Sequence, residues 1–227
     1  MKNREPQFMT WIKICGITNL EDALNAVDAG ADALGFVFYE QSPRKVDLET
    51  ARRVVGELPG KVEKVGVFVN QTEDSIGAVA DGAGLTAVQL HGDDMDPQVA
   101  DLIVKQRPHL KIIVGISMHH PKPEGRAMMW HADAIHAFLV DAGTSSKYGG
   151  TGRTFDWQTN RPSVEVIARL GRVVVAGGLD SANVAEAIHI LKPWGVDVAS
   201  GVEAAPGKKN PHRVRAFVDA VRRAQKN

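Results

Sequence analysis

Short hydrophobic runs alternate with longer amphipathic segments along nearly the whole chain. Several of the runs are almost continuous in Val, Ile and Leu, which is typical of parallel strands that are buried on both faces. Their length and spacing predict eight β-strands, at residues 12–15, 33–38, 63–69, 87–90, 111–116, 138–141, 172–176 and 196–200.

The segments between these runs carry helix signals. Thr18 followed by Glu21 matches a capping box, and apolar residues at helical spacing continue from there to Gly30. Asp47 also precedes an amphipathic segment and is a predicted N-cap. Two N-caps followed by a proline at the first helical position are predicted at Asp96-Pro97 and Asn210-Pro211, and the last two helices at 183–191 and 211–225.

Eight such β/α units in 227 residues favour the α/β class and a single (β/α)8 TIM barrel spanning residues 11–227. A doubly wound parallel sheet is the alternative, but it rarely holds eight regular units. The segment 117–136 is the least regular, because its prolines and glycine interrupt a long helix, and only a short helix at 127–131 is expected there. Residues 1–10 read as a flexible N-terminal extension.

Composition and charge narrow the function. Lys and Arg together number 27 and Asp and Glu together number 27, a balance that does not indicate binding to nucleic acid or to an acidic membrane surface. A single cysteine excludes an internal disulfide framework and a cysteine-rich zinc site. No run approaches the ~20 apolar residues of a membrane span. The first ten residues lack the apolar core of a secretory signal, so a cytoplasmic protein is expected.

In a barrel of this kind the active site is built at the C-terminal ends of the strands, and polar residues stand at several of these ends. Cys15 closes the first strand and Asp141 the sixth, so the two would form an acid/base couple across the mouth. Taken alone, a lone cysteine is more often a small buried hydrophobic residue. Arg44, after the second strand, is either a solvated loop residue or a bidentate partner for a substrate carboxylate.

Glycines follow the last two strands, where barrel enzymes often bind phosphate through backbone N–H groups. Gly177-Gly178 and Ser200-Gly201 therefore predict a phosphorylated ligand. The glycine-rich stretch 147–152 matches no nucleotide-binding motif, and a loop that closes over the mouth is the better interpretation. The eight histidines show no metal-ligand spacing, so no metal site is predicted.

Seven motifs together resemble the phosphoribosylanthranilate isomerase family of tryptophan biosynthesis, and the match runs from about Trp11 to the C-terminus. The motifs occur in the family's order, each at a strand end or in the loop that follows. They are Lys13-Ile-Cys-Gly-Ile-Thr18, Ser42-Pro-Arg44, Val88-Gln-Leu-His-Gly92, Leu139-Val-Asp141, Gly149-Gly-Thr-Gly152 with Phe155-Asp-Trp157, Ala176-Gly-Gly-Leu179 and Val196-Asp-Val-Ala-Ser-Gly-Val-Glu203.

The resemblance implies an Amadori rearrangement of N-(5-phosphoribosyl)anthranilate that needs no cofactor. By this analogy Asp141 is the general acid that protonates the furanose oxygen, Cys15 is the general base at sugar C2, and Arg44 holds the anthranilate carboxylate. The expected partner is this small molecule, and the expected assembly is a monomer or a homodimer. The analogy assigns the phosphate to Gly177, Gly178, Ser200 and Gly201, and other pocket positions to His91 and Asp197.

Two other functions stay open on the sequence alone. One is a related aminoaldose isomerase of histidine biosynthesis, in which two aspartates serve as acid and base, so that Cys15 argues against it. The other is a catalytically silent barrel that binds a phosphorylated ligand. It would need the glycine loops but neither the thiol nor Asp141.

Overall fold

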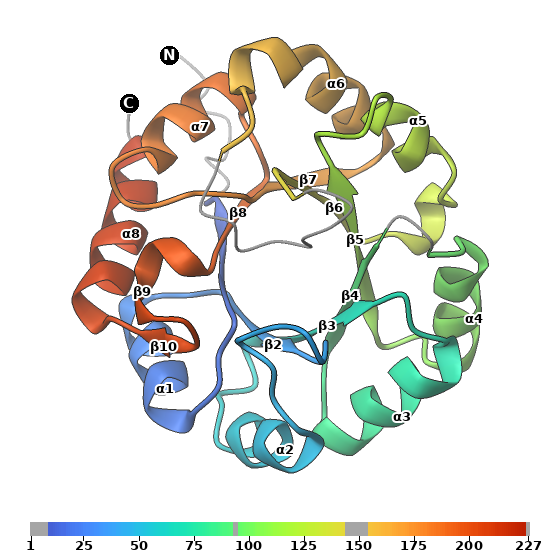
Figure 1. Ribbon diagram of the computed structural model, residues 1–227, viewed down its shortest axis with the longest axis vertical. Helices are drawn as coiled ribbons and strands as arrows, with labels where there is room; N and C mark the ends of the chain where they lie inside the picture. The colour runs from blue at the N-terminus through green and yellow to red at the C-terminus, as the bar shows by residue number, and fades with distance from the viewer. Residues whose placement is uncertain (1–8, 93–94, 144–153, 226–227) are drawn as a thin grey trace, which may run out of the picture.

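A computed structural model describes residues 9–92, 95–143 and 154–225, and it confirms the predicted barrel. Eight parallel strands close on themselves in chain order, with β1 hydrogen-bonded to β8, and the helices form a ring outside them (Figure 1). The strands are β1 (Trp11–Cys15), β2 (Ala33–Val37), β3 (Glu63–Val69), β4 (Ala87–His91), β5 (Lys111–Ser117), β6 (Ala137–Asp141), β7 (Arg172–Val175) and β8 (Gly195–Val198).

The outer helices follow the strands one by one and bury their apolar faces against the sheet. Asp47 and Asn210 cap their helices as predicted, and Gly30 ends the first helix in the left-handed conformation. The helices of the described chain are α1 (Leu20–Ala29), α2 (Leu48–Gly56), α3 (Glu73–Ala83), α4 (Gln98–Gln106), α5 (Pro123–Met128), α6 (Trp157–Leu170), α7 (Val184–Leu191) and α8 (Pro211–Ala224).

Three local predictions are wrong. The helix expected to begin at Pro97 behind an Asp96 cap begins at Gln98, and Pro97 itself is the N-cap. The N-cap of α1 is Asn19, whose side chain accepts from the backbone N–H of Asp22 at 2.8 Å, while the Thr18 hydroxyl donates to the carbonyl of Gly207. The fifth helix begins at Pro123 instead of residue 127, because a proline at the first helical position loses no hydrogen bond. A short 3-10 helix, η1 (Ala132–Ala134), occupies the position beyond it.

The chain after β8 forms elements that the hydrophobic pattern does not predict. The strand ends at Val198, and Ser200 begins a 3-10 helix, η2 (Ser200–Val202). A small antiparallel hairpin follows, made of β9 (Glu203–Ala205) and β10 (Lys208–Lys209). It lies beside the ends of β1 and β8, as Figure 1 shows. The hairpin therefore borders the end of the barrel at which the active site is expected.

The interior of the barrel changes character from one end to the other. Near the strand starts an apolar plug fills it, with Trp11 stacked on Trp194 at a centroid separation of 5.1 Å. Nearer the strand ends, buried polar side chains point inward and replace the apolar ones. This polar set includes Lys13, Gln89, His91, Asp141 and Asp197.

Both ends of the described chain are tied to the barrel. Thr10 is buried, its carbonyl accepts from the guanidinium of Arg222 in α8 at 2.6 Å, and its hydroxyl accepts from Gln225 at 2.8 Å. Residues 1–8, most of the expected extension, lie outside the described residues. None of the helices in the described chain is long and apolar enough to cross a membrane.

Candidate active site

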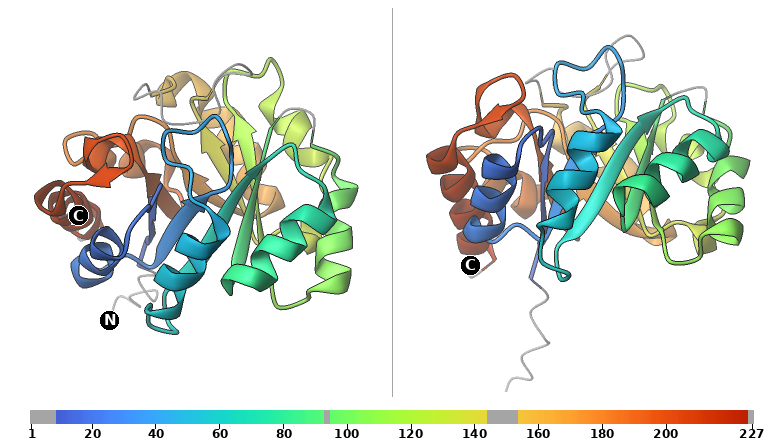
Figure 2. Two further views of the ribbon diagram at one scale, coloured as in Figure 1. Left: turned by 60° about the horizontal axis from the view of Figure 1, so that its bottom comes forward. Right: turned by 90° about the horizontal axis from the view of Figure 1, so that it is seen from below.

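The predicted acid and base both stand at the C-terminal end of the barrel. Cys15 is the last residue of β1 and Asp141 the last residue of β6, and only 8% and 7% of their surfaces are exposed. His91, at the end of β4, is equally buried, and its ring lies 3.3 Å from the amide nitrogen of Gln89. The loops that follow the strands gather above this end (Figure 2).

Beneath the thiol lies a buried ion pair that the sequence analysis did not identify. Lys13 precedes Cys15 by two residues on β1, so both side chains point into the barrel. Its ammonium is fully buried and lies 2.9 Å from the carboxylate of Asp197 on the neighbouring strand β8. Gly35 on β2 makes room for both, because an added Cβ there would lie 2.7 Å from the sulfur and 3.1 Å from the Lys13 side chain.

This ion pair sets the electrostatics of the thiol. Burial raises the pKa of Cys15, while the positive charge of Lys13 opposes that rise by stabilising the thiolate. Burial alone would lower the pKa of Lys13, but the charges of Asp197 and Cys15 outweigh it and raise the pKa. Lys13 therefore stays protonated beside the sulfur, as a counterion for a thiolate.

Asp141 is set up differently. Burial raises its pKa to about 6, partly offset by the backbone N–H of Gly143, which donates to its Oδ1 at 2.7 Å. The charge of Asp197 raises the pKa further and that of Lys13 lowers it. The charges of Lys13 and Asp197 thus act on the pKa of the carboxyl and on the pKa of the thiol, so the two predicted catalytic groups are coupled through this ion pair. A carboxylic acid with this pKa holds its proton readily enough to donate it near neutral pH.

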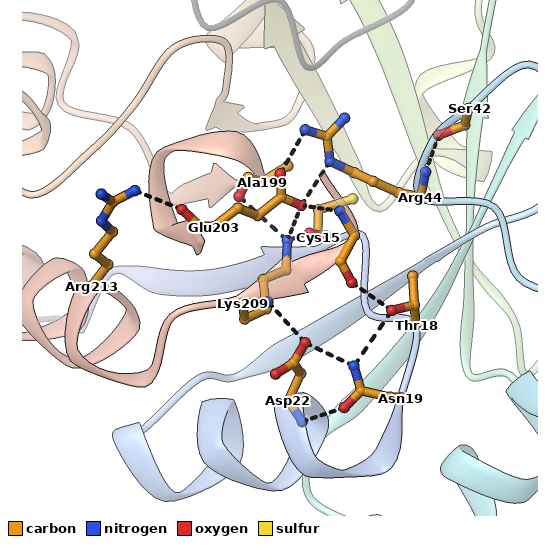
Figure 3. Close-up of polar contacts among 11 residues, drawn as sticks. Cys15, Thr18, Asn19, Asp22, Ser42, Arg44, Ala199, Glu203, Lys209 and Arg213 are labelled. Atoms are coloured by element: carbon orange, nitrogen blue, oxygen red, sulfur yellow. Dashed lines mark hydrogen bonds and ion pairs between the residues drawn. The ribbon is translucent and has the colours of Figure 1, made fainter. Parts of the chain in front are cut away.

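Arg44 reaches the same end of the barrel from the loop after β2. Its side chain lies over Gly16, the residue after Cys15, where a Cβ would come within 2.5 Å of the Arg44 Cδ. Its guanidinium makes a two-pronged ion pair with Glu203 on β9, at 2.8 Å from Nε and 2.7 Å from Nη2 (Figure 3). Arg44 is therefore a fixed part of the mouth and not a solvated loop residue.

The structure brings the predicted phosphate loops together. The loop after β7 holds Gly177 and Gly178, and the turn of η2 holds Ser200 and Gly201. The two loops touch, because a Cβ on Gly201 would lie 2.0 Å from the carbonyl oxygen of Leu179. The glycine-rich stretch 147–152, predicted to close over the mouth, lies outside the described residues.

Three buried charged residues of this site, Lys13, Glu203 and Lys209, are not among the residues predicted for it. Lys13 and Glu203 lie inside motifs that resemble the family, and Lys209 lies outside them. A charged residue facing the interior of a buried strand is the signal that identifies Lys13, since such a residue requires a partner. Glu203 and Lys209 give no comparable signal, because they lie outside the hydrophobic runs, in a short hairpin that the pattern does not predict.

Comparisons with known proteins agree on one family. The family model described as N-(5'-phosphoribosyl)anthranilate (PRA) isomerase matches residues 12–220. An N-(5'-phosphoribosyl)anthranilate isomerase from Pelobacter propionicus is 46% identical over 210 residues, which cover 92% of this chain and 94% of that protein. The enzyme of the same name from Thermotoga maritima is 43% identical over 210 residues, covering 92% of this chain and 97% of the relative.

Solved structures give the same result. The crystal structure of phosphoribosyl anthranilate isomerase from Thermotoga maritima superposes with a TM-score of 0.82 at 41% identity, covering 94% of this chain and 99% of that one. Another, in complex with reduced 1-(o-carboxyphenylamino)-1-deoxyribulose 5-phosphate, gives a TM-score of 0.79 at 38% identity, with the same coverage of both chains.

Proposed function

The chain belongs to the N-(5'-phosphoribosyl)anthranilate isomerase family, and we propose that Cys15 and Asp141 are the base and the acid of its reaction. The enzyme converts N-(5'-phosphoribosyl)anthranilate to 1-(2-carboxyphenylamino)-1-deoxyribulose 5-phosphate, an Amadori rearrangement in tryptophan biosynthesis. The observation that supports the two roles best is the buried Lys13–Asp197 pair, whose charges act on the thiol and on the carboxyl.

In the first step Asp141 gives its proton to the ring oxygen of the furanose. The bond between that oxygen and C1 breaks, and the anilino nitrogen supplies the electron pair for a protonated C1=N double bond. The raised pKa of Asp141 suits this step, because near neutral pH a larger fraction of this carboxyl carries a proton than in an ordinary aspartate. The product of the step is an open-chain Schiff base beside an ionised Asp141.

In the second step the thiolate of Cys15 removes the proton from C2. The electrons of the C2–H bond form a C1=C2 double bond, and those of C1=N return to nitrogen, which gives an enolamine. A proton then moves from the C2 hydroxyl to C1, and the ketone product results. The site ends as a thiol with a carboxylate, so one proton transfer restores its starting form. Lys13 stabilises the thiolate that begins this step.

The remaining residues position the substrate. We propose that Arg44 binds the anthranilate carboxylate and that Gly177, Gly178, Ser200 and Gly201 bind the phosphate. Binding of the carboxylate at one end of the substrate and of the phosphate at the other holds the sugar between the acid and the base. Such positioning supplies much of the rate enhancement in reactions that only move protons. His91 and Asp197 line the same pocket in this proposal.

The assay that tests the activity follows the fluorescence of the anthranilate adduct. Purified protein mixed with N-(5'-phosphoribosyl)anthranilate is expected to abolish this fluorescence far faster than buffer does. A decay equal to that in buffer would contradict the isomerase activity. The same assay in competition with the aminoaldose of histidine biosynthesis measures the preference between the two substrates.

Assembly and location complete the proposal. We propose a monomer or a homodimer that works in the cytoplasm, without a nucleic-acid partner. A solved relative from Thermotoga maritima is described as a dimeric enzyme from which monomers were generated. The mass in solution, measured by light scattering during size-exclusion chromatography, distinguishes the two states.

A further inference from the structure

The side chain of Lys209 lies beneath the rim of the mouth and joins three of its parts. Its ammonium donates to the carbonyl of Cys15 at 2.6 Å, to the carbonyl of Ala199 at 3.3 Å and to the carboxylate of Glu203 at 2.9 Å (Figure 3). Three acceptors require all three N–H groups of the charged amine. The last paired residues of β1 and β8 are Ile14 and Val198, so Lys209 links the two strands just beyond their ladder.

The Glu203 carboxylate in turn fixes the orientation of Arg44. One oxygen accepts from Arg44 Nε, from Lys209 and from the backbone N–H of Gly207, and the other accepts from Arg44 Nη2. Glu203 binds the Nε/Nη2 edge of the guanidinium. The Nη1/Nη2 edge remains available for a ligand, since none of the residues that the structure describes binds there. That edge has the geometry for two parallel bonds to a second carboxylate.

The charges of the cluster explain the presence of a buried lysine. Arg44 and Glu203 alone form a neutral pair, so repulsion from Glu203 would offset part of the attraction that Arg44 exerts on an approaching substrate carboxylate. Lys209, whose side chain is only 1% exposed, leaves the three-residue cluster with a net positive charge. Outside it, Asp22 accepts from the Lys209 backbone and Arg213 donates to the Glu203 carbonyl, and these two charges offset each other (Figure 3).

We propose that Glu203 and Lys209 are positioning residues that make the site select a substrate with an aryl carboxylate. Glu203 presents the free edge of Arg44, and Lys209 cancels the repulsion that Glu203 would otherwise exert on the incoming carboxylate. The selected class is an N-aryl aminosugar phosphate whose ring carries a carboxylate next to the nitrogen. The inference rests on the proposed role of Arg44.

A pair of ligands tests this selection. One is the reduced product, 1-(2-carboxyphenylamino)-1-deoxyribitol 5-phosphate, and the other is the same molecule without the carboxyl group. Calorimetry gives the dissociation constant of each, and their ratio is the carboxylate preference. Lys209→Met is expected to lower this preference at least about tenfold, the effect of losing one charge in a buried site, while binding of the carboxyl-free ligand stays nearly constant.

Three further variants complete the test. Lys208→Met removes a charge from the exposed neighbour and is expected to leave the preference unchanged, whereas Lys209→Arg is expected to restore most of it. Glu203→Asp keeps every charge but is too short to hold both nitrogens of Arg44, so the preference is expected to fall at least about fivefold. This variant decides the matter if Lys209→Met does not fold.

An unchanged preference in Lys209→Met or in Glu203→Asp, or an equal loss of affinity for both ligands, would overturn the inference and leave only a structural role. Arg44→Met separates this failure from a failure of the proposed function. If Arg44→Met also keeps the wild-type preference, the role of Arg44 itself is wrong. If Arg44→Met abolishes the preference while the other two variants retain it, Arg44 binds the carboxylate without the help of Glu203 and Lys209.

Discussion

Lys13 and Asp197 form an ion pair inside the barrel, 2.9 Å apart, although 184 positions separate them in the chain. The closure of the barrel between β1 and β8 places them on adjacent strands, with Lys13 and Asp197 in direct register. The pair lies next to Cys15, which makes it the electrostatic centre of the site.

Removing one member of this pair is expected to impair both stability and chemistry. Lys13→Met leaves the Asp197 carboxylate buried without its partner, a change that typically costs about 3–5 kcal/mol. It also removes the charge that stabilises the thiolate, so the alkaline limb of the pH–rate profile should move to higher pH.

Urea unfolding measures the loss of stability in Lys13→Met, and a pH series of kcat/KM measures the shift of the alkaline limb. The double variant Lys13→Met with Asp197→Asn should recover stability but not activity. An unshifted alkaline limb would argue against a role for Lys13 in thiolate formation.

Both proposed catalytic groups are expected to be essential for turnover. Cys15→Ala removes the base and Asp141→Asn removes the acid, and each should lower kcat at least ~100-fold, within the range that general acid–base groups contribute. Circular dichroism spectra that match the wild type would show that the fold is retained. Near-normal turnover in either folded variant would refute the role assigned to that residue.

The pH dependence of kcat/KM should be bell-shaped, with an acidic limb near the Asp141 pKa of about 6. Below that pH both groups are protonated and no thiolate exists. The alkaline limb should lie above the ordinary range of a cysteine, because burial raises the thiol pKa, and there both groups have lost their protons. Between the two limbs, the pair of groups holds one proton in total. The fraction of enzyme molecules with a protonated Asp141 and an ionised Cys15 is therefore constant over this pH range. A profile that is flat from pH 5 to pH 8 would contradict this arrangement.

Asp141 should also cost the protein stability at neutral pH. Because its folded-state pKa is raised from 3.8 to about 6, the native state binds the proton more tightly than the unfolded chain. The contribution of Asp141 to the free energy of unfolding is therefore lost as pH rises from about 4 to about 6. Above that range the free energy of unfolding is lower by about 3 kcal/mol than it is below it. Asp141→Asn, which still accepts the bond from Gly143, should be more stable than wild type at pH 8. At about pH 3.5 the two proteins should unfold at the same urea concentration. Equal stability at both pH values would contradict the raised pKa.

The sequence predicted most of the fold because each β/α unit carries its own local signals. Buried runs mark the strands, and caps such as Asp47 and Asn210 mark the helix starts. Errors arose where a tertiary contact overrides a local motif. Thr18 matches a cap but bonds to the β9–β10 turn, so Asn19 takes the capping position.

The site was predictable only in part, for a related reason. Cys15 and Asp141 follow from their positions at strand ends, and their chemistry can be named without knowing their neighbours. Lys13 meets Asp197 across 184 positions of the chain, Arg44 meets Glu203 across 159, and Lys209 reaches the Cys15 carbonyl across 194, and no local pattern encodes such contacts. The pair of Lys209 and Glu203 is local, but it lies in a hairpin that the hydrophobic pattern does not predict.

The link from Lys209 to the carbonyl of Cys15 has a consequence for the newly made chain. A nascent polypeptide that has emerged through β6 already contains the sulfur and the acid, but it lacks Asp197, Glu203 and Lys209. Its thiol has no counterion network, and the first strand has no final neighbour. The enzyme therefore becomes competent only after Asp197, Glu203 and Lys209 have been made and β8 closes against β1.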